Sequence, residues 1–428
     1  MPRDPAENPR SAEVGWHVHA FLRNRRAAEE RFLAELVRVP SDNPPGDCHP
    51  HAERTAVLLD ALGLSAEKHP VPEAIVKSHG MASVTNLVVR HRFGGGPVIA
   101  LNAHGDVVPP GLGWSADPYG AEVRDGVMYG RGAAVSKSDF ATYAFALLAV
   151  KDANERLGLE LGGAVELHLT YDEETGGLCG PGYLLSEGIS KPDYAISAGF
   201  SYNVVTAHNG CLHLEIELIG RSAHAAMPAS GIDALEAATS VLAALYDMRR
   251  DLAQYPSQTP GIGPAGLTVG LISGGINTNV VPDKVTMRLD RRIIPEEQPA
   301  AVEAALRRLV EETAARHPGI TTRIERILLA EPFIPMPGQD RLVAALREPA
   351  ARIFGTDIEY QGVPIYTDAR LYSAAGIPTV LYGAGPRTVL EANGHRADEK
   401  LKLDDLFRAT EVVALALIEL LILQPKTA

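Results

Sequence analysis

Cysteine is the scarcest informative residue in this chain. There are three cysteines in 428 residues, Cys48, Cys179 and Cys211, and no two of them form a CxxC pair. An odd and sparse set excludes a disulfide framework, and the missing CxxC pair argues against a thiolate zinc knuckle. We therefore expect reduced, mostly buried thiols in a cytoplasmic protein.

The chain also lacks an excess of basic residues and any long apolar run. The chain carries 40 Lys and Arg against 53 Asp and Glu, a net charge of −13, which speaks against nucleic-acid or anionic-membrane partners. The start, MPRDPAENPR, lacks the apolar core of a secretory signal. The most apolar run, Val412 to Leu423, has twelve residues and includes Glu419. A membrane span needs about 20, so this run predicts a buried C-terminal helix.

Apolar residues are abundant, at 46 % of the chain, and the length favours two domains. Short β-branched runs alternate with helical patterns in the first half, which predicts an α/β layer structure with a mostly parallel sheet. The expected helices are 14–38, 51–63 and 139–157, and the expected strands lie in NLVVRHR, PVIALNA and AVELHLT. The same pattern returns near the end, with a helix at 339–354, the strand TVLYG and the last helix.

The pattern differs between residues 208 and 329. CLHLEIELIG alternates apolar and polar residues, which is typical of a strand with one wet face. The elements expected after it are helix 231–250, strands near 266–272 and 283–293, helix 297–316 and strand 320–328. This β-α-β-β-α-β order indicates a ferredoxin-like module. We predict that 208–329 is an inserted lid or dimerisation domain and that 1–207 and 330–428 form a discontinuous catalytic domain.

Two motifs place ionisable groups at strand ends. LNAHGDVVPP brings His104 and Asp106 to the same face of a strand, where the carboxylate can hold one imidazole nitrogen and leave the other for a metal. TYDEETGG places Glu173 and Glu174 after a buried strand, where like charges resist joint ionisation unless a metal relieves them. Each motif also has a simpler interpretation. The first would be a surface histidine beside a turn aspartate, and the second would be a solvent-exposed acidic turn.

Other candidate residues lie in later motifs. GRSAHAAMP contains His224, GGINTNVVP contains Asn279, and RLDRRIIPEE contains Arg292. Arginine suits a substrate with a free carboxylate. EANGHRADEK contains His395. Taken singly, each residue also fits a structural or surface role.

Together, the motifs HGDVVP, DGVMYGRGA, DEETGG, GRSAHAAMP, GGINTNVVPD and YTDAR…GIP…YGAGP occur in one order. This set, over roughly residues 30 to 425, resembles the aminoacylase, acetylornithine deacetylase, succinyl-diaminopimelate desuccinylase and glutamate carboxypeptidase family of co-catalytic zinc peptidases. The resemblance implies an α/β catalytic domain with an inserted lid, a homodimer, and hydrolysis of an amide, peptide or N-acyl bond in a small carboxylate-bearing substrate.

The resemblance also implies roles for single residues. His104 would bind one metal with Asp106 orienting it, and Glu173 would be the general base. His224 would reach across a dimer to the developing oxyanion. Glu174 and His395 would bind the other metal. Asn279 and Arg292 would bind the substrate carboxylate.

Two positions depart from the family pattern. Where the family's GRGxxDxK motif has a bridging aspartate, this chain has Val135, although Lys137 is kept. A further acidic ligand is replaced by Gly199 in PDYAISAGFSYN. A valine cannot bind zinc, so we expect a reduced site with one divalent metal (zinc, manganese or cobalt) or none. Asp139, one helical turn after Val135, is a possible substitute carboxylate.

Three functions remain open at this point. The first is a hydrolase of the deacylase type with a reduced or absent metal site. The second is a metal-independent, non-hydrolytic enzyme in the same pocket, such as a lyase, decarboxylase, isomerase or racemase, in which a glutamate moves a proton beside a carboxylate held by Arg292. The third is a binding module, which needs only the lid and Arg292 and leaves the DEE motif unexplained. The missing ligands favour the second function, whereas the resemblance and the retained proton-transfer and substrate-binding residues favour the hydrolase, which is the function we expect.

Overall fold

The computed structural model describes residues 9–422, which form two compact units. The first comprises the chain up to Thr206, Pro335–Tyr360 and the chain from Leu371 on, and the second comprises Ala207–Ile334 and Gln361–Arg370. The domain bounds expected from the sequence stay a prediction. The compact units differ from these bounds in assigning 207, 330–334 and 361–370 to the second unit.

The large sheet has eight strands with parallel strands at its centre. Strands β6, β3, β7 and β14 pair in parallel, whereas β1, β2 and β8 pair with their neighbours in antiparallel fashion. In sheet order the strands are β1 (Ala66–Pro70), β2 (Thr85–Arg92), β6 (Ala164–Thr170), β3 (Val98–His104), β7 (Tyr194–Ser197), β14 (Thr379–Leu381), β8 (Asn203–His208) and β13 (Glu359–Val363). The predicted α/β class is confirmed.

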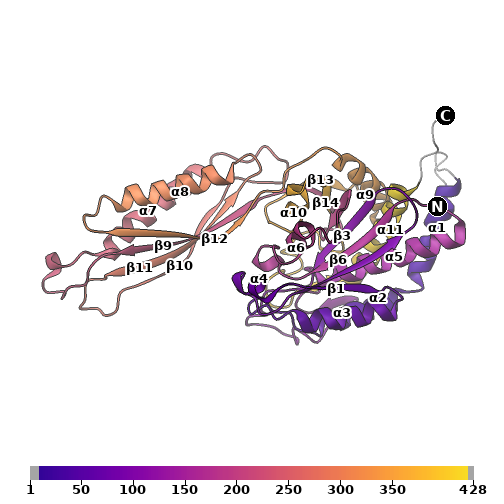
Figure 1. Cartoon of the computed structure of the whole chain (residues 1–428), viewed down its shortest axis with the longest axis horizontal. Helices are drawn as coiled ribbons and strands as arrows, with labels where there is room; N and C mark the ends of the chain where they lie inside the picture. The colour runs from indigo at the N-terminus through magenta and orange to yellow at the C-terminus, as the bar shows by residue number, and fades with distance from the viewer. Residues whose placement is uncertain (1–8, 423–428) are drawn as a thin grey trace. The chain divides into compact units, whose positions relative to one another are not determined.

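Helices cover this sheet on both faces, as parallel strands require. In β3, Ile99 and Leu101 join the main core, whereas Ala100 contacts a smaller cluster that contains Tyr372. Figure 1 shows α5, α9 and α11 along the sheet. The helices are α1 (Pro9–Arg23), α2 (Arg26–Val37), α3 (His49–Ala61), α4 (Glu73–Ser78), α5 (Lys137–Leu157), α6 (Pro181–Ser186), α9 (Gln339–Phe354), α10 (Ala369–Ala374) and α11 (Leu403–Leu421). A small sheet joins β4 (Glu122–Arg124), β5 (Val127–Tyr129) and β15 (Lys400–Lys402).

The helices at the two ends of the described chain differ in how well the sequence predicts them. The single helix expected at 14–38 is wrong, because the chain turns at Asn24 and Arg25 and forms α1 and α2 instead. The apolar run near the end is a buried helix, α11, as predicted, although Leu423 lies outside the described residues. Within residues 9–422, no helix has the length and apolar character needed to cross a membrane.

The second unit follows the predicted β-α-β-β-α-β order. Its four-stranded sheet has the order β10-β11-β9-β12, and all its pairs are antiparallel. Alternating residues of β9 (Leu212, Leu214, Ile216 and Leu218) pack into a core with α7 and α8, which lie together beside the sheet in Figure 1. The elements are β9 (Gly210–Ile219), α7 (Ala234–Leu252), β10 (Leu267–Gly274), β11 (Lys284–Ile293), α8 (Pro299–Ala314) and β12 (Thr321–Ala330).

Candidate active site of the first unit

Two parallel strands of the large sheet end side by side at the candidate site. His104 is the last residue of β3 and pairs with Thr170, the last residue of β6. The chain after β6 forms a short 3-10 turn over Glu173–Thr175. Because carboxyl ends of neighbouring parallel strands meet at one edge, His104 and the two glutamates are brought together from segments about seventy residues apart.

Asp106 holds this edge together. Its buried carboxylate accepts hydrogen bonds from Asn43 Nδ2 at 3.0 Å and from the backbone N–H groups of Glu173 and Glu174, both at 3.2 Å. His104 Nδ1 lies 3.0 Å from the Asp106 main-chain oxygen and 3.4 Å from its carboxylate. Burial alone would raise the Asp106 pKa, but the hydrogen bond with His104 and the others hold it below its usual range. Asp106 therefore orients both the imidazole and the glutamate turn.

The two adjacent glutamates face different histidines. Glu173 Oε2 lies 3.9 Å from His104 Nε2, and Glu174 Oε1 lies 3.3 Å from His395 Nε2. Burial opposes protonation of His104, yet the negative charges of Glu173 and Asp106 outweigh it and hold the His104 pKa well above its usual range. The hydrogen bond to Glu174 raises the pKa of His395. Each glutamate therefore raises the pKa of the histidine that it faces.

Val135 and Gly199 bring no donor atom to this site. The N–H of Val135 donates to Glu399 Oε1 at 3.1 Å, and Glu399 is a buried partner of Arg131 at 2.6 Å. A Cβ at Gly199 would lie 2.8 Å from backbone atoms of Leu381 and Tyr382. The segment after β7 therefore packs too closely on β14 for any side chain at position 199.

Asp139 does not replace the missing carboxylate. It is buried in α5, and its Oδ1 accepts a hydrogen bond from Ala384 N at 2.7 Å. Burial raises the pKa of Asp139 to about 7. Its carboxylate is therefore engaged with the backbone after β14.

Three of the predicted site residues form a group that could hold a divalent cation. Ligand atoms of His104, Glu173 and Glu174 all lie within 4.8 Å of one another. Glu174 also contacts His395, which is not part of that group. A histidine and carboxylates are ordinary ligands for zinc. Val135 and Gly199 add no carboxylate to this group.

The three lid candidates belong to the second unit, and they do not lie together there. The loop with His224 pairs with the loop with Asn279, since Ala225 N donates to Asn279 O at 2.9 Å. Arg292 lies near the other end of β11, a strand of 10 residues, or roughly 30 Å. A small substrate cannot touch Arg292 and His224 of the same unit.

Several residues of the first site were not predicted from sequence. Asn43 lies in the SDNPPGD loop, which the sequence marks only as a turn. Glu399 follows His395 by four residues, but its partners Arg131 and Val135 are more than 260 positions away. These contacts could not be predicted from sequence, because the fold brings together residues that are far apart along the chain.

An α/β sheet with parallel central strands, an inserted antiparallel unit and this His-Asp-Glu-Glu group define a metallopeptidase-like hydrolase. The chain belongs to peptidase family M20/M25/M40, whose family model matches residues 100–419. The family fold and deacylase-type relatives agree with hydrolysis of amide, peptide or acyl bonds.

Among curated proteins, the chain is 27% identical to a succinyl-diaminopimelate desuccinylase of a Nitratiruptor species, covering 74% of this chain and 85% of the relative. It is 28% identical to an acetylornithine deacetylase of Myxococcus xanthus, covering 84% and 88%. Two solved structures share the fold. They are the dipeptidase Dug1p of Saccharomyces cerevisiae (TM-score 0.76, 14% identity, 95% of this chain and 98% of that one) and YXEP of Bacillus subtilis, described as a dinuclear metal binding peptidase (0.61, 19%, 94% and 98%).

Proposed function

We propose that the chain hydrolyses an amide, peptide or N-acyl bond in a small carboxylate-bearing substrate, with one divalent cation in place of two. His104 and Glu174 would hold the cation, with His395 as a third ligand. The observation that carries the proposal is the convergence of His104, Glu173 and Glu174 beside Val135, which has no donor atom. The named relatives, a desuccinylase and a deacetylase, support the bond type.

The roles of the chain's own residues follow from their positions. A bound cation would polarise the scissile carbonyl and lower the pKa of a water molecule. Glu173 accepts a proton from the attacking water and returns it to the leaving nitrogen, so that a carboxylate and an amine are formed. Asp106 keeps Nδ1 of His104 occupied, which presents Nε2 to the site.

We also propose that the working form is a homodimer. His224 and Asn279 lie about one strand length from Arg292, so one substrate is better served by His224 and Asn279 of a partner subunit. His224 would then donate to the developing oxyanion, and Arg292 would bind the substrate carboxylate. The edge strand β10 supports an interface, because Leu271 and Ile272 are 61% and 49% exposed.

The test is activity on a panel of N-succinyl amino acids, N-acetyl amino acids and dipeptides, before and after chelation. We expect hydrolysis of at least one class, loss of activity with a chelator, and recovery with zinc, manganese or cobalt. Turnover of a panel member that is indifferent to chelation would overturn the role of the cation.

A metal-independent, non-hydrolytic reaction is the second candidate, favoured by the closed position at Gly199 and the donor-free Val135. In that case Glu173 or Glu174 would remove a proton next to a carboxylate held by Arg292. Chelated protein incubated in deuterated water with candidate carboxylates would then exchange the α-hydrogen. Hydrolysis without such exchange would exclude this candidate.

A further inference from the structure

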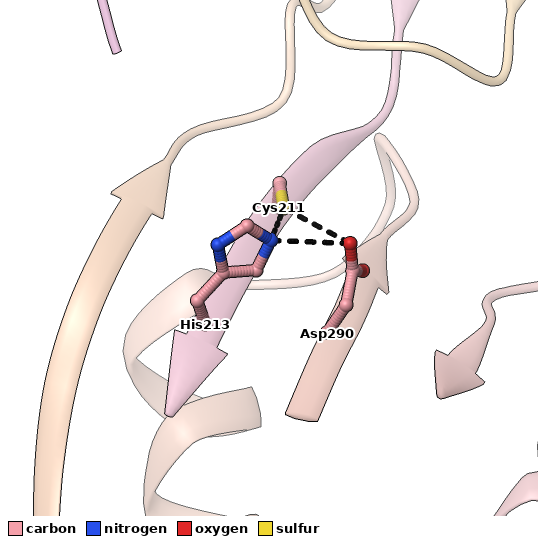
Figure 2. A group of neighbouring side chains, drawn as sticks. All are labelled: Cys211, His213 and Asp290. Atoms are coloured by element: carbon pink, nitrogen blue, oxygen red, sulfur yellow. Dashed lines mark hydrogen bonds and ion pairs between the residues drawn. The ribbon is translucent and has the colours of Figure 1, made fainter. Parts of the chain in front are cut away.

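A second group of metal-type donors lies in the second unit, on two neighbouring strands. Cys211 and His213 are two residues apart on β9 and share a face of the sheet, and His213 pairs directly with Asp290 on β11. Figure 2 shows the three side chains turned toward one another. None of them belongs to the His104 and Glu174 group.

The three donor atoms converge on one point. Cys211 Sγ lies 3.1 Å from His213 Nε2 and 3.7 Å from Asp290 Oδ2, and the His213 to Asp290 distance is 3.1 Å. In tetrahedral zinc sites with ordinary bond lengths, such donor atoms are about 3.4–3.6 Å apart. The group therefore needs shifts of only a few tenths of an ångström to surround a cation.

The same distances argue against a thiol nucleophile. In a catalytic Cys-His-Asp arrangement, one imidazole nitrogen faces the thiol and the other faces the carboxylate. Here both Cys211 and Asp290 contact the same nitrogen, Nε2 of His213, as Figure 2 shows. This geometry suits three ligands around an ion better than a proton relay.

Neighbouring groups fix the donors and leave an entry path. Arg292 Nε donates to Asp290 Oδ1 at 3.0 Å, which leaves Oδ2 for the cluster. Such outer contacts orient metal ligands. Cys211 is fully buried, whereas the side chains of His213 and Asp290 are 35% and 29% exposed. An ion can therefore arrive from solvent and meet the thiol last.

We propose that Cys211, His213 and Asp290 bind one divalent cation of the zinc and cobalt class through Sγ, Nε2 and Oδ2. Coordination replaces the thiol proton, which is released. Three protein ligands leave a fourth position open for water or an anionic group, as in zinc sites that are not purely structural. The cation would cross-link β9 and β11, and the inference does not rest on the proposed hydrolysis.

Titration of the chelator-treated full chain with Co²⁺ alone tests the proposal. A thiolate bound to cobalt gives a charge-transfer absorption in the near ultraviolet. The His104 and Glu174 group contains no sulfur, so it gives no such band. We expect the band to grow with cobalt and saturate. Its absence at saturating cobalt would overturn the proposal and leave a hydrogen-bonded cluster only.

Matched variants locate the site. Cys211→Ser should abolish the band, and Cys179→Ser, which removes another buried thiol, should retain it.

His213→Asn should weaken the cobalt affinity at least about 10-fold, the lower bound for outer-contact losses. His317→Asn, a histidine of the same unit bonded to Ser240, should leave it unchanged. Because His213 is partly exposed, its variant keeps the test valid if Cys211→Ser fails to fold. A band that survives Cys211→Ser, or an unchanged affinity in His213→Asn, would contradict the assignment.

Discussion

Glu173 and Glu174 are neighbours in sequence, but their environments suit different work. Both glutamates belong to the donor group with His104, but Glu174 also lies 3.3 Å from His395, whereas Glu173 lies 3.9 Å from His104. The turn that separates them is fixed by Asp106, which accepts the N–H groups of both. This difference is why we propose Glu174 as the cation ligand and Glu173 as the general base.

Glu173→Gln should lower kcat about 100- to 10,000-fold, the usual contribution of a positioned general base. The amide keeps the size of the side chain but cannot accept the proton from water. Glu187→Gln, an exposed glutamate in the same part of the chain, is the matched control and should not change kcat. Steady-state turnover of the substrate found in the panel measures both. Unchanged turnover in Glu173→Gln would reject the general base.

At the scale of elements, the sequence predicts regular segments well and close approaches poorly. The alternation in β9 predicted a strand, and β9–α7–β10–β11–α8–β12 follows the predicted order, because period two and period 3.6 are local properties. The break between α1 and α2 was missed, since both halves have helical patterns. The meeting of Cys211, His213 and Asp290 was missed because it depends on the register between β9 and β11.

Gly199 illustrates such a close approach. A Cβ there would meet Leu381 and Tyr382 backbone atoms at 2.8 Å, so Gly199→Ala should lower the free energy of unfolding by about 1–3 kcal/mol, as overpacking does. Gly95→Ala, where the added atom meets nothing within 4 Å, should change it by less than about 0.5 kcal/mol. Urea unfolding of both variants checks this prediction. If Gly199→Ala were as stable as Gly95→Ala, the backbone around β14 would have shifted to accommodate the added Cβ.

The contact between α2 and α11 predicts a pH effect. Glu29 is buried and accepts a hydrogen bond from Thr410, and burial raises its pKa from 4.5 to about 8. The native state thus holds this proton more tightly than the unfolded chain. The stability from Glu29 is complete below pH 4.5 and is lost as the pH rises through 8.

Glu29→Gln cannot ionise, so its stability relative to the original chain should rise by about 4 kcal/mol between pH 5 and pH 9. Thermal unfolding across this range measures the difference. A Glu29→Gln difference that stays constant across this range would mean that Glu29 ionises freely in the folded protein.

At the scale of the whole molecule, each of the two compact units has its own core and its own donor group. The first carries the group with His104, and the second carries the group with Cys211. The second unit also contains Arg292, His224 and Asn279. Arg292 and His224 are separated by most of the length of β11. If one substrate contacts both residues, as we propose, the two residues belong to different chains.

Subunit complementation tests that requirement. Glu173→Gln and His224→Ala should each be nearly inactive as pure proteins. When they are mixed and allowed to exchange subunits, half the dimers are mixed and each has one intact site, so about one quarter of the original activity should return. Recovery of no activity in verified mixed dimers would place His224 in the site of its own chain or outside any site.

The number of cations beside Val135 is the central claim, and zinc-edge anomalous diffraction from zinc-equilibrated crystals tests it most directly because it locates each ion. We predict one anomalous peak among His104, Glu174 and His395, whether or not a separate peak lies at Cys211. Two peaks about 3.5–4 Å apart beside Glu174, the spacing of two-metal sites, would contradict the account.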